Sequence, residues 1–135
     1  MSAGYSGTPL AKKIGIKAGH SVAILHEAPE FRGLLADLPD DVDLDAGLTD
    51  QPDVTVAFYT EAEVLDAELG RLADAAFPDR MIWIAWPKRT SGVETDLTGD
   101  VVRRTVLATD LVDVKVCAIS ETWSGLKVVW RTSAR

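Results

Sequence analysis

The chain has 135 residues, of which 47% are hydrophobic and 26% charged, enough for one compact domain but too few for two. Its net charge of -7 and its scattered basic residues argue against binding to nucleic acid through phosphate contacts. A single cysteine, Cys117, allows neither an internal disulfide nor a multi-thiolate metal site. No apolar run reaches the roughly 18 to 20 residues of a membrane span, and no signal peptide is evident, so we expect a soluble cytoplasmic protein.

The first expected elements are a short helix and a buried strand. Residues 1–7 are small and are expected to form a flexible arm. Thr8 and Pro9 are typical of a helix start and Gly15 of a helix end, so the intervening LAKKI is expected to be helical. The apolar run over 20–26 is too continuous for a strand with one wet face, which predicts burial on both faces.

The segment at 29–39 is expected to be a helix, because its apolar residues recur at helical spacing between two prolines. These residues are Phe31, Leu34, Leu35 and Leu38. Residues 40–51 are acidic and rich in turn formers, and they could hold a short strand at 42–45. Residues 53–59, DVTVAFY, predict a second buried strand.

A capping box predicts the start of the next helix. Thr60 and Glu63 have the T-x-x-E spacing in which the two residues cap the first turn reciprocally. Apolar residues behind them mark the buried stripe of this helix: Val64, Leu65, Leu69, Leu72, Ala73 and Ala76. RMIWIAW, residues 80–86, is the most apolar run of the chain and is expected to be a central strand.

The last part of the chain predicts a loop, a helix and a hairpin. PKRTSGVET, residues 87–95, leads into a helix at 97–110. The alternating pattern of VDVKVCA, followed after ETWSG by LKVVWR, predicts two antiparallel strands. Strands that alternate with helices imply a mostly parallel sheet with both faces covered. The expected fold is a single three-layer, Rossmann-like α/β domain over 8–135, with about five to six strands and a C-terminal antiparallel hairpin.

Candidate site residues follow from the expected sheet. In an open parallel sheet the ligand crevice lies beyond the carboxyl ends of the strands. The loops at that edge supply the candidate ligand-binding residues, which are His26, Glu27, Lys88, Arg89, Ser91, Gly92, Glu121 and Trp123. The cations at 88–89, near a helix N-terminus, could bind phosphate or carboxylate. The alternative is a plain connection in which Gly92 turns the chain and Lys88 and Arg89 face solvent.

Known cofactor and catalytic motifs are missing from the sequence. A dinucleotide or adenosylmethionine site needs glycines after the first strand, whereas this chain has HEAPEFRG at 26–33, with Glu27 and Glu30 where a phosphate would lie. His20 and His26 flank one strand about 20 Å apart, so they cannot share a metal ion. His26 with Glu27 could supply a general base or could serve structure alone. We therefore expect no cofactor, no metal site and no catalytic residue.

Several motifs together resemble a bacterial family of short proteins of unknown function. They are YSG at 5–7, GIKAG at 15–19, PEF at 29–31, WPK at 86–88, SG at 91–92, TDLT at 95–98 and ETWSGLK at 121–127. More distantly, the order of elements and the closing hairpin resemble the class I methyltransferase fold. That second resemblance implies an adenosylmethionine site after the first strand, and the sequence departs from it by lacking the glycine loop.

These patterns suggest different functions. The first is a non-catalytic binding or regulatory protein on a reduced methyltransferase-like scaffold, with an unidentified protein partner. The alternative is an enzyme or small-molecule binder that holds an anionic ligand at loops 87–93 and 120–125. A homodimer through the edge of the C-terminal hairpin is a further hypothesis, with Lys127 and Arg131 on one face and Trp130 exposed for pairing.

Overall fold

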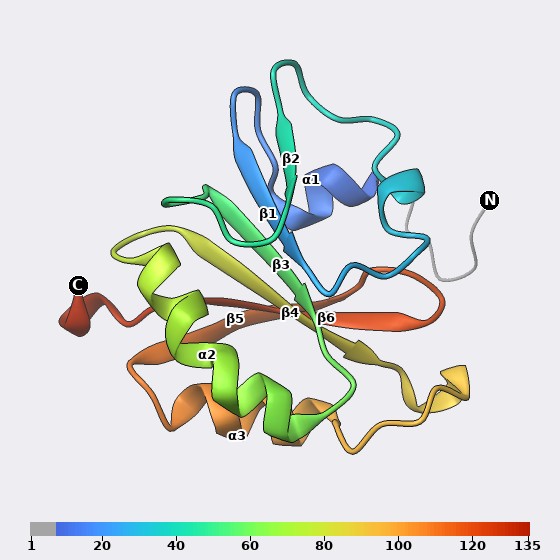
Figure 1. Ribbon diagram of the computed structural model, residues 1–135, viewed down its shortest axis with the longest axis vertical. Helices are drawn as coiled ribbons and strands as arrows, with labels where there is room; N and C mark the ends of the chain where they lie inside the picture. Colours follow the sequence, from blue (N-terminus) through green and yellow to red (C-terminus); the bar gives the residue numbers. More distant parts are fainter. Residues whose placement is uncertain (1–7) are drawn as a thin grey trace.

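Six strands form one twisted sheet in the computed structural model, which describes residues 8–135 (Figure 1). The flexible arm expected at 1–7 lies outside the described residues. The strands are β1 (Ser21–Leu25), β2 (Asp43–Ala46), β3 (Val54–Phe58), β4 (Met81–Pro87), β5 (Leu111–Ala118) and β6 (Trp123–Trp130). The α-helices are α1 (Leu10–Ile14), α2 (Ala62–Ala76) and α3 (Gly99–Leu107), and the 3-10 helices are η1 (Arg32–Leu34), η2 (Arg89–Ser91) and η3 (Thr132–Ala134).

The strand order is β2-β1-β3-β4-β6-β5. The first four strands in this order run parallel, whereas β6 is antiparallel to both β4 and β5. This topology confirms the expected Rossmann-like α/β domain with a C-terminal antiparallel hairpin. Because parallel strands are covered on both faces, β3 is buried along its whole length, and β1 and β4 are buried after their first residue. The short strand considered at 42–45 is present as β2, at one edge of the sheet.

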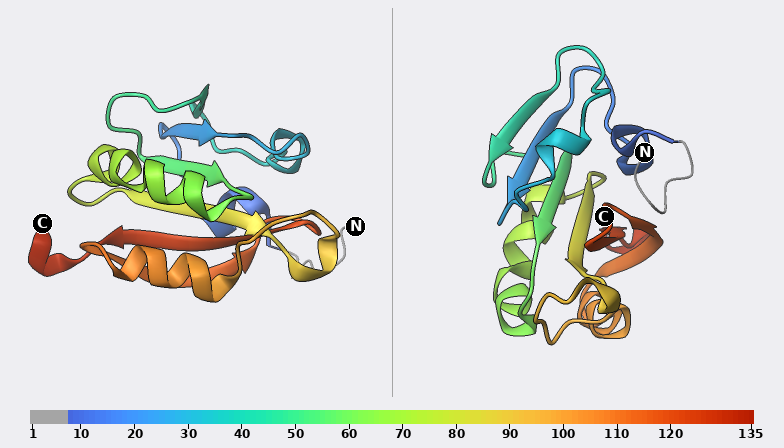
Figure 2. Two further views of the ribbon diagram at one scale, coloured as in Figure 1. Left: turned by 60° about the horizontal axis from the view of Figure 1, so that its bottom comes forward. Right: turned by 90° about the vertical axis from the view of Figure 1, so that its right-hand side faces the viewer.

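Helices cover the two faces of the sheet separately, as Figure 2 shows. α2 and α3 pack against one face, where Leu69 and Val102 belong to the same buried cluster. α1 and the segment around η1 cover part of the other face, where Ile14 and Phe31 are buried. The Nε1 of the fully buried Trp83 donates to the Ile14 carbonyl oxygen at 2.9 Å and ties α1 to β4.

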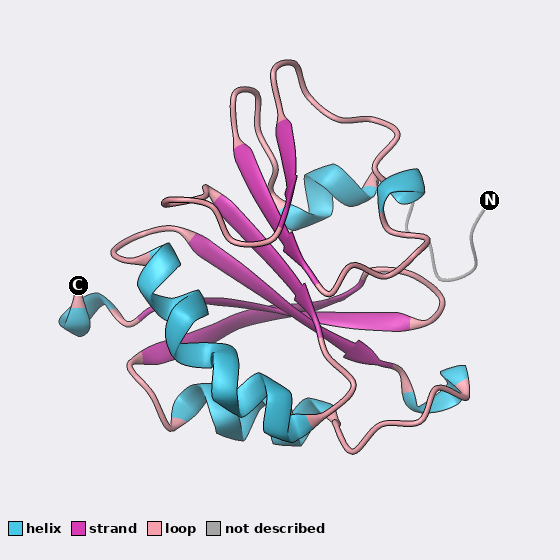
Figure 3. Cartoon of the chain, viewed as in Figure 1, coloured by secondary structure: helices cyan, strands magenta, loops and turns pink. Residues whose placement is uncertain are grey.

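The prediction of a helix at 29–39 is wrong. This stretch is largely loop and contains only the short helix η1 (Figure 3). Its backbone makes i to i+3 hydrogen bonds, from Leu34 to Phe31 and from Leu35 to Arg32. Gly33 disfavours a helix here, and a segment this short between two prolines is a marginal helix. Phe31 and Leu35 still reach the core, so burial alone does not require a regular helix.

The capping box expected for α2 is also absent. Neither the N-cap residue Glu61 nor any other side chain of the T-x-x-E motif caps the helix. The Asp96 carboxylate accepts from the Ala62 amide at 2.8 Å instead. The Thr95 hydroxyl donates to the Thr60 carbonyl at 2.6 Å. The loop before α3 therefore fixes the start of α2, because a distant carboxylate replaces the local cap.

The length of α3 and the burial of Trp130 differ from what the sequence predicted. α3 is shorter than the expected 97–110, and its N-cap Thr98 accepts from the Val101 amide at 3.2 Å. Trp130, expected to be exposed, is partly buried, because its Nε1 donates to the Ala73 carbonyl and its ring packs on Phe77 at 4.9 Å. Among the described residues, no helix is both long and apolar enough to cross a lipid bilayer.

Candidate functional site

The loops that follow β4 and β5 lie side by side at the carboxyl edge of the parallel strands. The Lys88 amide donates to the Thr122 carbonyl at 2.7 Å, which joins the 87–93 loop to the turn between β5 and β6. Pro87 and Trp123 are also register partners across β4 and β6. The fold therefore brings together the two loops that the sequence suggested as a binding edge.

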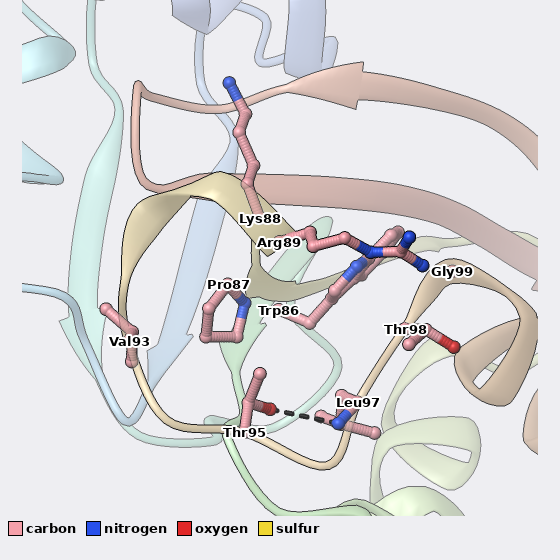
Figure 4. A pocket seen from close by; sticks show the side chains of 9 residues that line it. All are labelled: Trp86, Pro87, Lys88, Arg89, Val93, Thr95, Leu97, Thr98 and Gly99. Carbon is pink, nitrogen blue, oxygen red and sulfur yellow. Dashed lines mark hydrogen bonds between the residues drawn. The ribbon is translucent and has the colours of Figure 1, made fainter.

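A cavity of about 350 Å³ opens between the end of β4 and the start of α3 (Figure 4). Its lining residues are Trp86, Pro87, Lys88, Arg89, Val93, Thr95, Leu97, Thr98 and Gly99. Trp86 is only 7% exposed. A Cβ atom placed on Gly99 would lie 3.5 Å from Trp86 Cζ2, so the start of α3 approaches this ring closely. The volume is within the range of pockets that bind small molecules.

The side chains of Arg89 and Lys88 point in different directions. In Figure 4 the Arg89 side chain extends past Trp86 toward Gly99, whereas the Lys88 amine points away from the other lining residues. Within residues 8–135, neither side chain forms a hydrogen bond or an ion pair. No carboxylate is present among the described residues that line the cavity. The N-terminal end of α3 adds partial positive charge beside Arg89, and its first turn also carries Asp100.

Ser91 and Gly92 shape the loop and do not line this cavity. The Ser91 hydroxyl donates to the Lys88 carbonyl at 2.7 Å and accepts from the Val93 amide at 3.2 Å. Gly92 has a φ of 80°, a left-handed conformation that glycine adopts without steric strain. These two residues therefore hold η2 in place and so set the direction of Arg89.

His26 lines a second cavity, at the ends of β1 and β3. This space of about 360 Å³ is lined by His26, Phe58, Tyr59, Thr60, Glu61, Val64 and Trp123. His26 has a φ of 53°, which is uncommon for a residue other than glycine. Its Nε2 lies 2.9 Å from a Glu68 carboxylate oxygen. Trp123 packs edge-on against Phe58, with ring centroids 5.1 Å apart.

Glu27 does not pair with His26. Its carboxylate accepts from Arg32 Nε at 2.8 Å, an ion pair within the loop after β1. Glu121 is exposed in the turn between β5 and β6. Among the described residues, no group of three or more His, Cys, Asp or Glu side chains could hold a metal ion.

Glu68 is a functional candidate that the sequence did not reveal. Its carboxylate accepts from the Tyr59 hydroxyl at 2.7 Å as well as contacting His26. Burial raises the pKa of Tyr59, and Glu68 raises it further, so the phenol stays protonated. Burial opposes ionisation of Glu68, but hydrogen bonds with Tyr59 and His26 outweigh it and lower the pKa of the carboxyl. Helical periodicity places Glu68 beside Leu69 without showing which loop it meets.

Comparisons of the chain with known proteins give the fold and no more. No protein-family model matches, and no curated protein has a similar sequence. The structure is similar to a SAM-dependent methyltransferase from Aquifex aeolicus, with 14% identity, a TM-score of 0.61 and coverage of 88% of this chain and 86% of that chain. It is also similar to magnesium protoporphyrin IX methyltransferase from Synechocystis PCC 6803, with 9% identity, a TM-score of 0.55 and coverage of 90% and 78%.

A third similar structure is a protein in the NADB-Rossmann superfamily from Streptococcus agalactiae. It shares 13% identity with a TM-score of 0.53, and the match covers 96% of this chain and 70% of that one. The chain therefore has a methyltransferase-like, Rossmann-like fold. Since a fold of this kind serves many chemistries, function has to be argued from the site.

Proposed function

We propose that this chain is a non-catalytic binding protein that holds a small anionic molecule between the end of β4 and the start of α3. The observation that supports this most directly is Arg89, whose side chain lies beside a cavity of about 350 Å³ and has no hydrogen-bond or ion-pair partner within residues 8–135. The anionic group would meet Arg89 and the first amides of α3. An apolar body would contact Pro87, Val93 and Leu97.

The chemistry of the lining favours binding over catalysis. The cavity residues include no imidazole, thiol or carboxylate, the groups that most often transfer protons or attack substrates. Among the described lining residues, Lys88 carries an amine, but this amine points away from the other side chains (Figure 4). The described lining therefore offers charge and shape that suit a small anionic ligand, but no side chain placed to act on it as an acid or a base.

The loop after β1 supports a function that does not use adenosylmethionine. Cofactor sites of this fold need backbone amides that approach the ligand closely after the first strand. Here His26 contacts Glu68 and Glu27 pairs with Arg32. Ala28 is buried with an exposed fraction of 3%. Side-chain contacts therefore hold the loop after β1, and the cavity of about 360 Å³ beside it has no glycine among its described lining residues.

Phenyl phosphate tests the proposal, because it combines an anionic group with a flat apolar body. Ligands that bind the folded state alone raise its stability by mass action. We expect millimolar phenyl phosphate to raise the melting temperature by several degrees. Inorganic phosphate and benzyl alcohol, which each carry one half of the chemistry, should raise it less. A flat response to all three compounds would contradict an anion site.

Two charge-removing variants locate the site. Arg89→Gln should abolish the shift, whereas the matched variant Lys88→Gln should retain most of it. Equal effects of the two variants would show that the ligand responds to general charge and not to this cavity. Adenosylmethionine and adenosylhomocysteine belong in the same panel, and a clear shift with either would favour a methyltransferase-type site over the one proposed.

A further inference from the structure

The β5–β6 hairpin presents a basic surface on an acidic protein. Lys115 and Lys127 are direct register partners across β5 and β6. Lys127 is also the partner of Trp83, whose side chain is buried on the α1 side of the sheet. Lys13 reaches the same region from α1, since its Nζ donates to the Ala118 carbonyl at 2.9 Å. The charges of Lys115 and Lys17 both act on Lys127, and we refer to Lys17, Lys115 and Lys127 as the lysine face.

The charges of the lysine face repel one another. Like charges directly opposite on neighbouring strands destabilise a sheet. Burial lowers the pKa of the Lys127 amine, and Lys115 and Lys17 lower it further. Among the described residues, none of these three amines pairs with a carboxylate. The fold therefore keeps an unfavourable cluster that an external anion would relieve.

Protection of a sheet edge explains only part of this surface. β5 is an edge strand, and edge lysines and bulges hinder unwanted pairing with other chains. Lys115 and the register shift between Asp113 and Lys115 fit that role. Lys127 does not fit it, because β6 lies inside the sheet between β4 and β5. A partly buried lysine at that position needs a different reason.

The free edge of β5 adds a second feature. After the register shift, residues 115–118 follow a regular ladder with β6, and in the described chain no strand pairs with their other side. Val116 is 51% exposed. It is the register partner of Leu126, which is buried on the α2 and α3 side of the sheet, so this valine and Lys115 face opposite sides.

We propose that the β5 edge and the lysine face bind an extended acidic segment of a partner protein, which adds to the sheet as a further strand. In such a strand successive side chains point to opposite faces. Acidic residues at alternate positions would lie on the face that carries Lys115 and Lys127, with one of them level with this lysine pair, and the apolar residues between them would lie on the face of Val116. Nucleic acid is disfavoured, because the net charge of -7 repels a long polyanion while one local surface attracts a short one.

The test uses a fluorescein-labelled peptide of alternating Glu and Val, eight residues long to match β5. Fluorescence anisotropy with the full chain should show saturable binding that weakens as salt is added. A peptide with Gln in place of Glu should bind much more weakly. Lys127→Gln and Lys115→Gln should each weaken binding by roughly threefold to fivefold, the range expected for one surface ion pair.

Arg104→Gln is the matched control, because Arg104 is exposed on α3 on the other side of the sheet and its loss changes the net charge equally. This variant should bind the Glu peptide like the parent chain. Circular dichroism of each variant would confirm folding. The proposal is overturned if the Gln peptide binds equally well, if all three variants behave alike, or if a single-stranded thymidine oligonucleotide binds more tightly than the peptide.

Hydrogen exchange supplies a separate readout. Addition of the Glu peptide should slow exchange of β5 amides that point outward in residues 115–118. Protection confined to the loop at 87–93 would instead place the peptide at the Arg89 cavity and contradict strand addition. Because the two surfaces share no residue, failure of this proposal would leave the small-anion cavity unaffected.

Discussion

A single carboxylate on α2 organises the end of β1. Glu68 accepts from the Tyr59 hydroxyl at 2.7 Å and contacts His26 Nε2 at 2.9 Å. The sequence identified His26 as a candidate, but it suggested Glu27 as the partner because the two are adjacent in the chain. The actual partner depends on how α2 is rotated against the sheet. Periodicity predicts the buried stripe of a helix, but it does not predict which polar residue beside the stripe meets a given loop.

We expect Glu68→Gln to lower the free energy of unfolding by about 1 to 2 kcal/mol at pH 7, because a charge-assisted hydrogen bond becomes a neutral one. The folded pKa of Glu68 lies below its usual 4.5. Its contribution is therefore complete above pH 4.5 and is lost as the pH falls through the folded pKa. Urea unfolding at pH 7 and pH 3 should show the difference between variant and parent shrinking in acid.

Asp66→Asn, an exposed position on the same helix, is the control for Glu68 and should change stability little. If Glu68→Gln is as stable as the parent chain at pH 7, then Glu68 does not hold the end of β1. A difference that stays constant down to pH 3 would show that the effect of the substitution does not come from the charge of the carboxylate.

The hairpin of β5 and β6 depends on a close contact at Gly125. A Cβ atom there would lie 2.7 Å from Ile119 Cδ1 and 3.2 Å from Trp83 Cε3. Alternating hydrophobicity predicted this hairpin correctly, and apolar periodicity predicted α2 and α3. The same periodicity failed at 29–39, where Gly33 and the flanking prolines outweigh it. Sequence patterns therefore located the long elements, whereas short segments depend on contacts from elsewhere in the chain.

We expect Gly125→Ala to lower the free energy of unfolding by about 1 to 3 kcal/mol, because the added methyl group overpacks the space between Ile119 and Trp83. The end of the Ile119 side chain can shift, but the buried Trp83 ring cannot move as easily. Gly70→Ala in α2 is the matched control, because no atom lies within 4 Å of its Cβ position. That variant should stabilise the chain by up to about 1 kcal/mol. Thermal or urea unfolding measures both, and equal effects would rule out crowding at Gly125.

The charge of the whole molecule is divided unevenly over its surface. The net charge is -7, yet the lysine face and Arg89 are both without a carboxylate partner within residues 8–135. Alternation of strands and helices predicted the fold, and the fold predicted the edge where loops 87–93 and 120–125 meet. The sequence could not distinguish Lys88 from Arg89, because the turn of η2 decides their directions. It could not reveal the lysine face, whose members come from three separate segments.

We expect Lys127→Gln to leave the melting temperature unchanged or to raise it slightly at low ionic strength, because the substitution removes like-charge repulsion. The lowered pKa means that the folded state disfavours protonated Lys127. The repulsion is therefore present at neutral pH and fades as the pH rises through the folded pKa. Added salt should reduce any rise in the melting temperature of this variant, because salt screens the repulsion. A melting temperature that falls equally at low and high salt would show that Lys127 serves packing instead.

Binding of a small anion in the cavity between β4 and α3 is tested most directly by titrating the ¹⁵N-labelled chain with phenyl phosphate and recording two-dimensional NMR spectra. We expect saturable shifts of the amides at 87–93 and 95–99 and of Arg89 Nε, with little change at the end of β1. The absence of saturable shifts, or shifts centred on residues 26–33, would contradict an anion site at Arg89.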